Sequence, residues 1–402
     1  MAGQAEERKG SIWEVFAVSL RLGLTSFGGP IAHLGYFRDE YVNRRKWFDD
    51  KTYAELVALC QLLPGPASSQ VGISIGMMRA GLLGGLASWM GFTLPSAAAL
   101  MAFAVLIRHY DVTEAGWLHG LIIAAVAVVA GAVWGMARTL APDRTRGTIA
   151  ILTAIITLLW PTPYGQFLLI AAAGCFGRFF LPTSADKAEL AKLPAESRIN
   201  LGKRVALTSW AILFMLLLGL PLLRQAFPVP WLAMFDSFFR VGSLVFGGGH
   251  VVLPLLQAEV VPAGWVTDAQ FLAGYGAAQA VPGPLFTFSA FLGAVANGWQ
   301  GALIALIAMF LPSYLLVAGS LPLWGAIRRR PHAQAALQGI NAAVVGLLVA
   351  ALFHPVWTSA IHSSLDFCLA LAAFALMMLW KLPPWVVVIF SAAGGTMLSL
   401  LH

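Results

Sequence analysis

Two arginines stand at equivalent places in two apolar stretches of the chain, each six residues before a cluster of glycines. Arg21 precedes Phe27-Gly28-Gly29-Pro30, and Arg240 precedes Phe246-Gly247-Gly248-Gly249. An arginine inside an apolar membrane segment is costly and by default suggests a function. Its planar guanidinium suits the oxygens of a carboxylate or a tetrahedral anion. The alternative is structural, because each arginine could pair with a nearby carboxylate, cap backbone carbonyls or reach the membrane interface.

Each glycine cluster is followed by a Pro-Gly-Pro break with a glutamine three residues ahead of it. The breaks are Pro64-Gly65-Pro66 after Gln61 and Pro282-Gly283-Pro284 after Gln279. A break frees backbone N–H groups at the start of the next half-helix, where the helix dipole is equivalent to about +0.5 charge. Glycine lets a ligand approach the backbone, and proline at the first helical position loses no hydrogen bond. The four breaks therefore predict an anion cradle. Close helix packing by the glycines and helix joining by the glutamines are the alternatives.

These motifs occur twice in the same order and at a nearly constant spacing. Arg21 and its glycine cluster return 219 residues later, and the Gln-x-x-Pro-Gly-Pro stretch returns after 218. The stretch from Phe92 to Ser96 returns after about 217 residues. Three motifs in one order, with a slowly drifting spacing, predict a duplicated unit. We call residues 11–181 the first copy and residues 231–402 the second copy.

The elements that must position these residues are transmembrane helices. Of the 402 residues, 59% are hydrophobic and 11% are charged, whereas soluble domains carry about 25% charged residues. About 20 apolar residues suffice to cross a bilayer, and several such runs occur, from Leu82–Ile107 to Pro384–Leu401. We therefore expect an all-α polytopic membrane protein and exclude a soluble enzyme or a disordered chain. The net charge of +7 does not predict nucleic-acid binding, because it lies in short loops between apolar runs.

The charges of the loops predict that the two copies have opposite orientations. Residues 37–51 carry five Lys or Arg and the equivalent residues 259–268 carry none. The imbalance reverses for residues 108–114 and 328–332, which carry one and three. Because cytoplasmic loops are enriched in Lys and Arg, the second copy is expected to be inverted. The predicted architecture is two inverted-topology repeats with broken or re-entrant helices, which is typical of transporters with a binding site near the bilayer midplane.

The predicted organisation follows from these charges. A cytoplasmic N-terminal tail (residues 1–10) precedes the first copy (11–181). A basic cytoplasmic linker (182–204) and an inverting transmembrane helix (205–224) precede the second copy (231–402). We expect a multi-pass protein of the bacterial inner membrane with its N-terminus in the cytoplasm and its C-terminus in the periplasm. Nothing in the sequence indicates a catalytic residue, a metal site or a cofactor. The expected partner of the protein's apolar surface is the lipid bilayer. A homodimer through GxxxG faces is compatible with the sequence.

Some ionisable and motif residues have a second interpretation. The pattern Gly72-Ile73-Ser74-Ile75-Gly76 matches a hydrolase nucleophile elbow, but it lies in an apolar helix and also forms a GxxxG packing face. Ionisable residues near the breaks are candidates for proton coupling, with a role at a helix rim or interface as the alternative. These candidates are His33, His250, Glu40, Glu259 and Asp236.

The motifs resemble those of the chromate ion transporter family in its long, two-domain form. The resemblance rests on Arg21 with its glycine cluster, on residues 61–66 and on residues 246–254, and it extends roughly from Val15 to the C-terminus. It implies a membrane transporter of divalent oxyanions, with chromate efflux and chromate resistance as the expected activity. Sulfate is a similar oxyanion, so uptake or exchange of sulfate or another anion is an alternative, as is a passive anion channel.

The expected binding residues come from the resemblance and from the residues themselves. Gln61 and Gln279 are expected binding residues on their own chemistry, because their side-chain amides are neutral hydrogen-bond donors. A strictly symmetric site is not expected, because Pro30 is replaced by Gly249 and Ser68-Ser69 by Phe286-Thr287 in the second copy. The resemblance implies Arg21, Gly28, Gly29, Pro30, Pro64, Gly65 and Pro66 in the first copy, and Arg240, Gly247, Gly248, Gly249, Pro282, Gly283 and Pro284 in the second.

Overall fold

The chain is helical throughout the part that the structure describes. The computed structural model describes residues 11–27, 29–109, 116–160, 163–181, 202–245, 252–323 and 331–401. Every regular element in these ranges is a helix, which confirms the predicted all-α class. The elements are α1 (Ile12–Thr25), α2 (Gly29–Arg38), η1 (Asp39–Arg44), α3 (Asp50–Leu62), α4 (Ala67–His109), α5 (Gly116–Leu140), α6 (Arg144–Leu159), α7 (Pro163–Phe180), α9 (Lys203–Ala226), α10 (Pro230–Leu244), α11 (Val252–Val260), α12 (Asp268–Ala280), η3 (Leu285–Thr287), α13 (Phe288–Ser320), η4 (Leu321–Leu323), α15 (Pro331–Ala351), η5 (Leu352–Trp357), α16 (Thr358–Ala360), α17 (Ser364–Met378) and α18 (Pro384–Leu401).

The helices have the length and surface of a membrane protein. In the described ranges, five stretches are long and apolar enough to cross a bilayer, in α4, α5, α9, η3 to η4 with α13, and α15 to α16. Shorter apolar helices are α7, α17 and α18. Large apolar side chains such as Leu207, Met215 and Leu218 are exposed on α9. An apolar surface of this kind fits contact with lipid.

An inner group of helices contains the two Pro-Gly-Pro breaks, at residues 64–66 and 282–284, and the start of α2 at Gly29. In it, α1 packs along α4, α10 packs along α13, and α4 packs on α13. Both long helices bend sharply at equivalent glycines, Gly81 with a φ of +67° and Gly298 with a φ of +61°. Beyond each bend the chain folds back, so that Gly76 faces the backbone of Gly84. Glycine is required there because a side chain would collide with the facing carbonyl.

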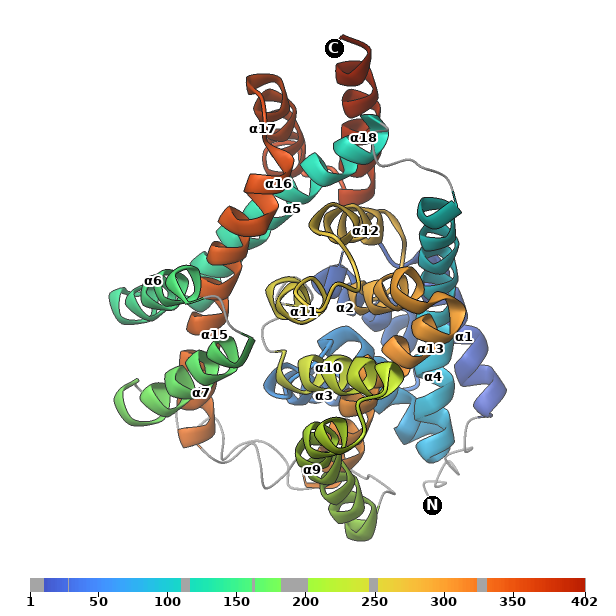
Figure 1. Cartoon of the computed structure of the whole chain (residues 1–402). Coiled ribbons are helices and arrows are strands. Elements are labelled where there is room, and N and C mark those ends of the chain that lie inside the picture. The colour runs from blue at the N-terminus through green and yellow to red at the C-terminus, as the bar shows by residue number, and fades with distance from the viewer. Residues whose placement is uncertain are drawn as a thin grey trace.

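An outer group consists of α5 to α7 and α15 to α18, and in it helices of one copy pack on helices of the other. α15 packs on α6 and α7, while α5 packs on α17 and α18. Gly120 touches the backbone of Ser391 in α18, and the equivalent Gly339 touches the backbone of Ala173 in α7. Figure 1 shows the outer group on the left and at the top and the inner group to the lower right. The two groups meet where α11 and α12 contact α5, α7, α15 and α18.

Equivalent helices also begin with equivalent caps. Asp143 accepts a hydrogen bond from the backbone N–H of Arg146 at 2.9 Å and begins α6. Ser363, which stands 220 residues later, accepts one from Asp366 at 3.1 Å and begins α17. Thr267 caps α12 with a reciprocal capping box. Such local signals mark helix starts independently of tertiary packing.

Candidate functional site

The Pro-Gly-Pro break of each copy packs against the other copy. The backbone N–H of Gly283 donates to the carbonyl of Ser26, at the end of α1, with an N–O distance of 2.9 Å. The backbone N–H of Gly65 donates to the carbonyl of Val245, at the end of α10, with a distance of 2.6 Å. Ser26 and Val245 are equivalent positions. We call the Ser26–Gly283 contact the first junction and the Val245–Gly65 contact the second junction.

Both junctions need glycine. The φ of Gly283 is +99° and that of Gly65 is +120°, a region that L side chains rarely adopt. A Cβ atom on Gly283 would lie 2.8 Å from Oγ of Ser96. A Cβ atom on Gly65 would collide with Oγ of Ser313, the equivalent serine of the second copy. The backbone of each break is therefore held directly against the long bent helix of the other copy.

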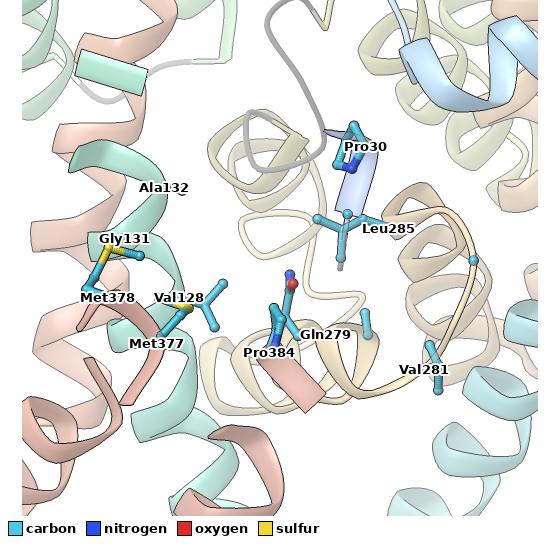
Figure 2. A pocket seen from close by; sticks show the side chains of 13 residues that line it. Pro30, Val128, Gly131, Ala132, Gln279, Val281, Leu285, Met377, Met378 and Pro384 are labelled. Carbon is cyan, nitrogen blue, oxygen red and sulfur yellow. The ribbon is translucent and has the colours of Figure 1, made fainter. Parts of the chain in front are cut away.

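A cavity of about 210 Å³, which we call the first cavity, lies beside the first junction. One water needs about 10–15 Å³ of such space, so a small hydrated ion fits. Figure 2 shows Pro30 and Leu285 on one side of it and Val128, Met377 and Met378 on the other. The wall of the inner group comes from α2, α12, the break after α12 and η3. The outer wall comes from α5, the end of α17 and the start of α18.

Three helices begin at the wall of the first cavity. α2 begins at Gly29, η3 with the following α13 begins at Leu285, and α18 begins at Pro384, and these residues line the cavity. Helix starts present free N–H groups and the positive end of the helix dipole. Gln279 adds a buried amide Nε2 that has no hydrogen-bond partner in the described part of the chain. The described lining residues include no Asp, Glu, Lys or Arg. The cavity is thus suited to an anion held by neutral donors.

Neither predicted arginine lines the first cavity, and their surroundings differ. Arg240 is 9% exposed. Its Nη2 lies 3.1 Å from Oδ2 of Asp236 and 3.0 Å from Oε2 of Glu259. Arg21 is exposed, and within the described ranges it forms no ion pair. Arg240 therefore has the structural pairing that the sequence left open.

Most of the other predicted site residues that the structure describes lie at the two junctions. Gly29, Pro30, Gln279 and Gly283 line the first cavity. Gln61 is exposed near the end of α3. Pro282 and Pro284 flank Gly283 at the first junction, and Pro64, Gly65 and Pro66 form the second junction. Gly28, Gly247, Gly248, Gly249 and His250 lie outside the described residues.

The described candidates for proton coupling lie away from the lining of the first cavity. His33 is buried, and its Nδ1 lies 3.3 Å from Oγ of Ser68. Glu40 pairs with Arg45, whose Nε lies 2.7 Å from Oε1. The two remaining described carboxylates pair with Arg240 as given above. These contacts correspond to the interface role that the sequence left as the alternative.

Sequence reasoning missed the outer wall of the first cavity. Gly131, Met377, Met378 and Pro384 belong to it. Only Pro384 carries a local signal, because a proline before an apolar run marks a helix start. The methionines lie in a helix that is apolar all round, so its sequence does not tell which face meets a cavity. In the described part of the chain, no group of three His, Cys, Asp or Glu could hold a metal ion.

Known proteins are similar to this chain over almost its whole length. The family model described as "Chromate transporter" matches residues 13–178 and 232–396. The chain is 29% identical to a chromate transport protein of Pseudomonas aeruginosa, over 95% of this chain and 90% of that protein. It is 28% identical to a probable chromate transport protein of Synechococcus elongatus, over 93% of each. It is also 28% identical to a chromate transport protein of Cupriavidus metallidurans, over 95% of this chain and 92% of that protein. No solved structure matches the chain.

Proposed function

This chain belongs to the chromate transporter family, and from that premise we propose that it exports chromate from the bacterial cell and so confers chromate resistance. Membership makes it a multi-pass membrane transport protein. The direction of transport and the residues that bind the anion are our proposals. The observation that supports them is the convergence of three helix starts on one cavity without a lining carboxylate.

Chromate binds in the first cavity in this proposal. The positive ends of α2, of η3 with the following α13, and of α18 face its oxygens. Gly29 and Leu285 supply backbone N–H groups at the cavity wall, and the amide of Gln279 donates a further hydrogen bond. Gly29 and Gly283 allow the backbone to approach the anion. The Pro-Gly-Pro residues 64–66, together with Pro282 and Pro284, shape the two junctions. Neutral donors suit a transporter, since the bound anion must also leave.

The charge of the substrate favours export. Moving one charge across 100 mV is worth about 2.3 kcal/mol, so a dianion that leaves a negative interior gains about 4.6 kcal/mol. That gain corresponds to roughly three decades of concentration. Uncoupled movement, or exchange for a monoanion, therefore drives chromate outward. Symport with more than two protons would reverse the electrical contribution and favour uptake.

We also propose that the protein lies in the inner membrane with a cytoplasmic N-terminus and a periplasmic C-terminus. The support is the difference in charge between two equivalent loops. Residues 37–51 carry five Lys or Arg, and residues 259–268 carry none. Reporter fusions after Asn43 and after Pro262 test the inversion. We expect the two reporters on opposite sides of the membrane, and reporters on the same side contradict inverted copies.

Flux measurements test the function. Purified protein is reconstituted in proteoliposomes, and radiolabelled chromate and sulfate fluxes are measured while membrane potential and pH gradient are imposed separately. We expect saturable chromate flux that follows the potential toward the positive compartment. Flux driven inward by a proton gradient indicates uptake, sulfate flux without chromate flux indicates a different substrate, and flux that does not saturate indicates a channel.

A further inference from the structure

A second cavity, of about 220 Å³, lies between α11 of the inner group and α6, α7 and α15 of the outer group. It is separate from the first cavity, because the two share no lining residue. Nothing in the transport proposal above uses it. Its lining residues, compared with the equivalent residues of the other copy, indicate its function.

The outer walls of the two cavities are built from equivalent residues. Thr157 and Leu158, at the end of α6, line the second cavity, and 220 residues later Met377 and Met378, at the end of α17, line the first. The correspondence continues on the central helices of the outer group. There the second cavity is lined by Leu347, Ala350 and Ala351 of α15, and the first by Val128, Gly131 and Ala132 of α5, each 219 residues earlier.

The two cavities face opposite ends of the outer group. His119, in the first turn of α5, lies 2.9 Å from Asp366 and stacks on His362, both beyond the end of α15 and α16. α5 and α15 therefore run in opposite directions, as Figure 1 also shows. Each cavity adjoins the C-terminal half of its own central helix. The two cavities are consequently displaced from the middle of this helix pair toward opposite ends.

The second cavity also carries polar side chains that lack partners. Thr157 is 8% exposed and Gln166 is 7% exposed. Oγ1 of Thr157 and Oε1 of Gln166 have no hydrogen-bond partner in the described part of the chain. Gln166 lies at the start of α7, so the helix dipole is positive there. A threonine hydroxyl can donate, and the two ends of a glutamine amide can exchange places. The cavity thus offers neutral donors and a helix start, as the first cavity does.

We propose that the second cavity binds the same class of tetrahedral oxyanion at the opposite end of the transport path. This inference rests on the proposed function of the first cavity. The outer group presents equivalent walls to the inner group at both ends, and the anion is held by neutral donors at each. Gln279 then sets affinity for substrate arriving from one side of the membrane. Thr157 and Gln166 set affinity for substrate arriving from the other.

Sided transport kinetics test this assignment. The KM for radiolabelled chromate is measured in proteoliposomes of one orientation, once with substrate outside and once with substrate inside. We expect Thr157→Val with Gln166→Leu to raise KM about tenfold from one side only, and Gln279→Leu to raise it about tenfold from the other side only. The single variant Thr157→Ser, which keeps the hydroxyl, should have the wild-type KM from both sides. Thr153→Val, one turn earlier on α6 and outside the cavity lining, should leave KM unchanged from both sides.

The outcomes separate the two proposals. A double variant with wild-type KM from both sides, or with its defect on the same side as Gln279→Leu, overturns the second site and leaves the first intact. Absence of saturable flux in the wild-type protein instead contradicts the proposed function. If the double variant does not fold, Thr157→Val and Gln166→Leu are measured singly, and the sidedness of each KM decides in the same way.

Discussion

The first copy packs polar side chains between α2 and the start of α4, whereas the second copy packs apolar ones at the equivalent positions of α11 and η3. His33 contacts Ser68 in the first copy. Their equivalents are Val252 and Phe286, both buried. At the ends of α1 and α10, Ser26 corresponds to Val245. The backbone at the two junctions is the same, since both carbonyls accept a hydrogen bond from a Pro-Gly-Pro glycine.

This difference separates what makes the repeat from what makes the site. Glycines and helix caps, which shape the backbone, are equivalent in the two copies. Several of the side chains around them differ, as at His33, Ser68 and Ser26, and at these positions the polar residue belongs to the first copy. Several buried polar atoms there, including Oγ of Ser26 and Oγ of Ser69, have no partner in the described part of the chain. An unsatisfied buried polar group costs about 1–3 kcal/mol, and such costs are typical of functional regions.

The largest contrast between the copies is expected at the two arginines. Arg240→Gln leaves the buried carboxylate of Glu259 without its cation and leaves Asp236 with Arg224 alone, which should destabilise the fold by about 3–5 kcal/mol. Arg21→Gln removes an exposed side chain and should change stability by less than about 0.5 kcal/mol. Thermal unfolding in detergent compares the two. If the Arg21→Gln protein is stable but has lost chromate flux, Arg21 contributes to substrate binding after all.

The glycines of the two junctions should respond alike in stability and differently in transport. Gly65→Ala and Gly283→Ala each place a Cβ at a positive φ and against a serine, which should cost about 2 kcal/mol or more. Only Gly283 lines the first cavity, so only its variant should also raise KM for chromate. Thermal unfolding and flux are measured together. The control is Gly147→Ala, where a Cβ meets nothing within 4 Å, and equal KM values for the two junction variants contradict the placement of substrate.

The two glutamines should differ in affinity at unchanged stability. Gln279 lines the first cavity with an unpaired Nε2, and a hydrogen bond to an anion is worth about 1.5–3 kcal/mol. Gln279→Leu should therefore raise KM by about tenfold, the change that the lower figure predicts. Gln61 is the equivalent residue of the first copy and is exposed, so Gln61→Leu serves as the matched control with wild-type KM. The reverse result would move the site to the second junction.

The smallest effects are expected at the helix caps, where pH distinguishes a carboxylate cap from a hydroxyl cap. Hydrogen bonds from the backbone N–H and the side chain of Arg146 lower the pKa of Asp143, so its stabilising contribution is present at neutral pH. Asp143→Ala should cost about 1 kcal/mol there. The cost should fade as the pH drops below the unfolded pKa of about 3.9 and through the lower folded pKa. Thr267→Ala removes a cap without an ionisable group and should lose a similar amount at either pH. Thermal unfolding at pH 7 and at pH 3 measures both.

Local sequence signals predicted a large part of the fold. The Pro-Gly-Pro breaks, the spacing of the two copies and the apolar runs are readable from residues close together in the chain. Gly29, Pro30, Gln279 and Gly283 were predicted as site residues, and the structure brings these four to one cavity. It leaves Arg21 and Gln61 exposed and pairs Arg240 with carboxylates. Charge and spacing mark such residues as notable, but they do not tell which neighbours a helix face will meet.

The sequence by itself determined that the chain is helical, lies in a membrane and is interrupted at defined points, because hydrophobicity and backbone constraints act over a few residues. Only the tertiary structure decided which break meets which. The carbonyl of Ser26 accepts a hydrogen bond from the N–H of Gly283, more than half the chain away. Helix α5 closes a cavity beside α2 of the first copy and α12 of the second. These contacts depend on the packing of helices that are apolar on every face, and such packing follows from shape and close approach rather than from any pattern within one helix.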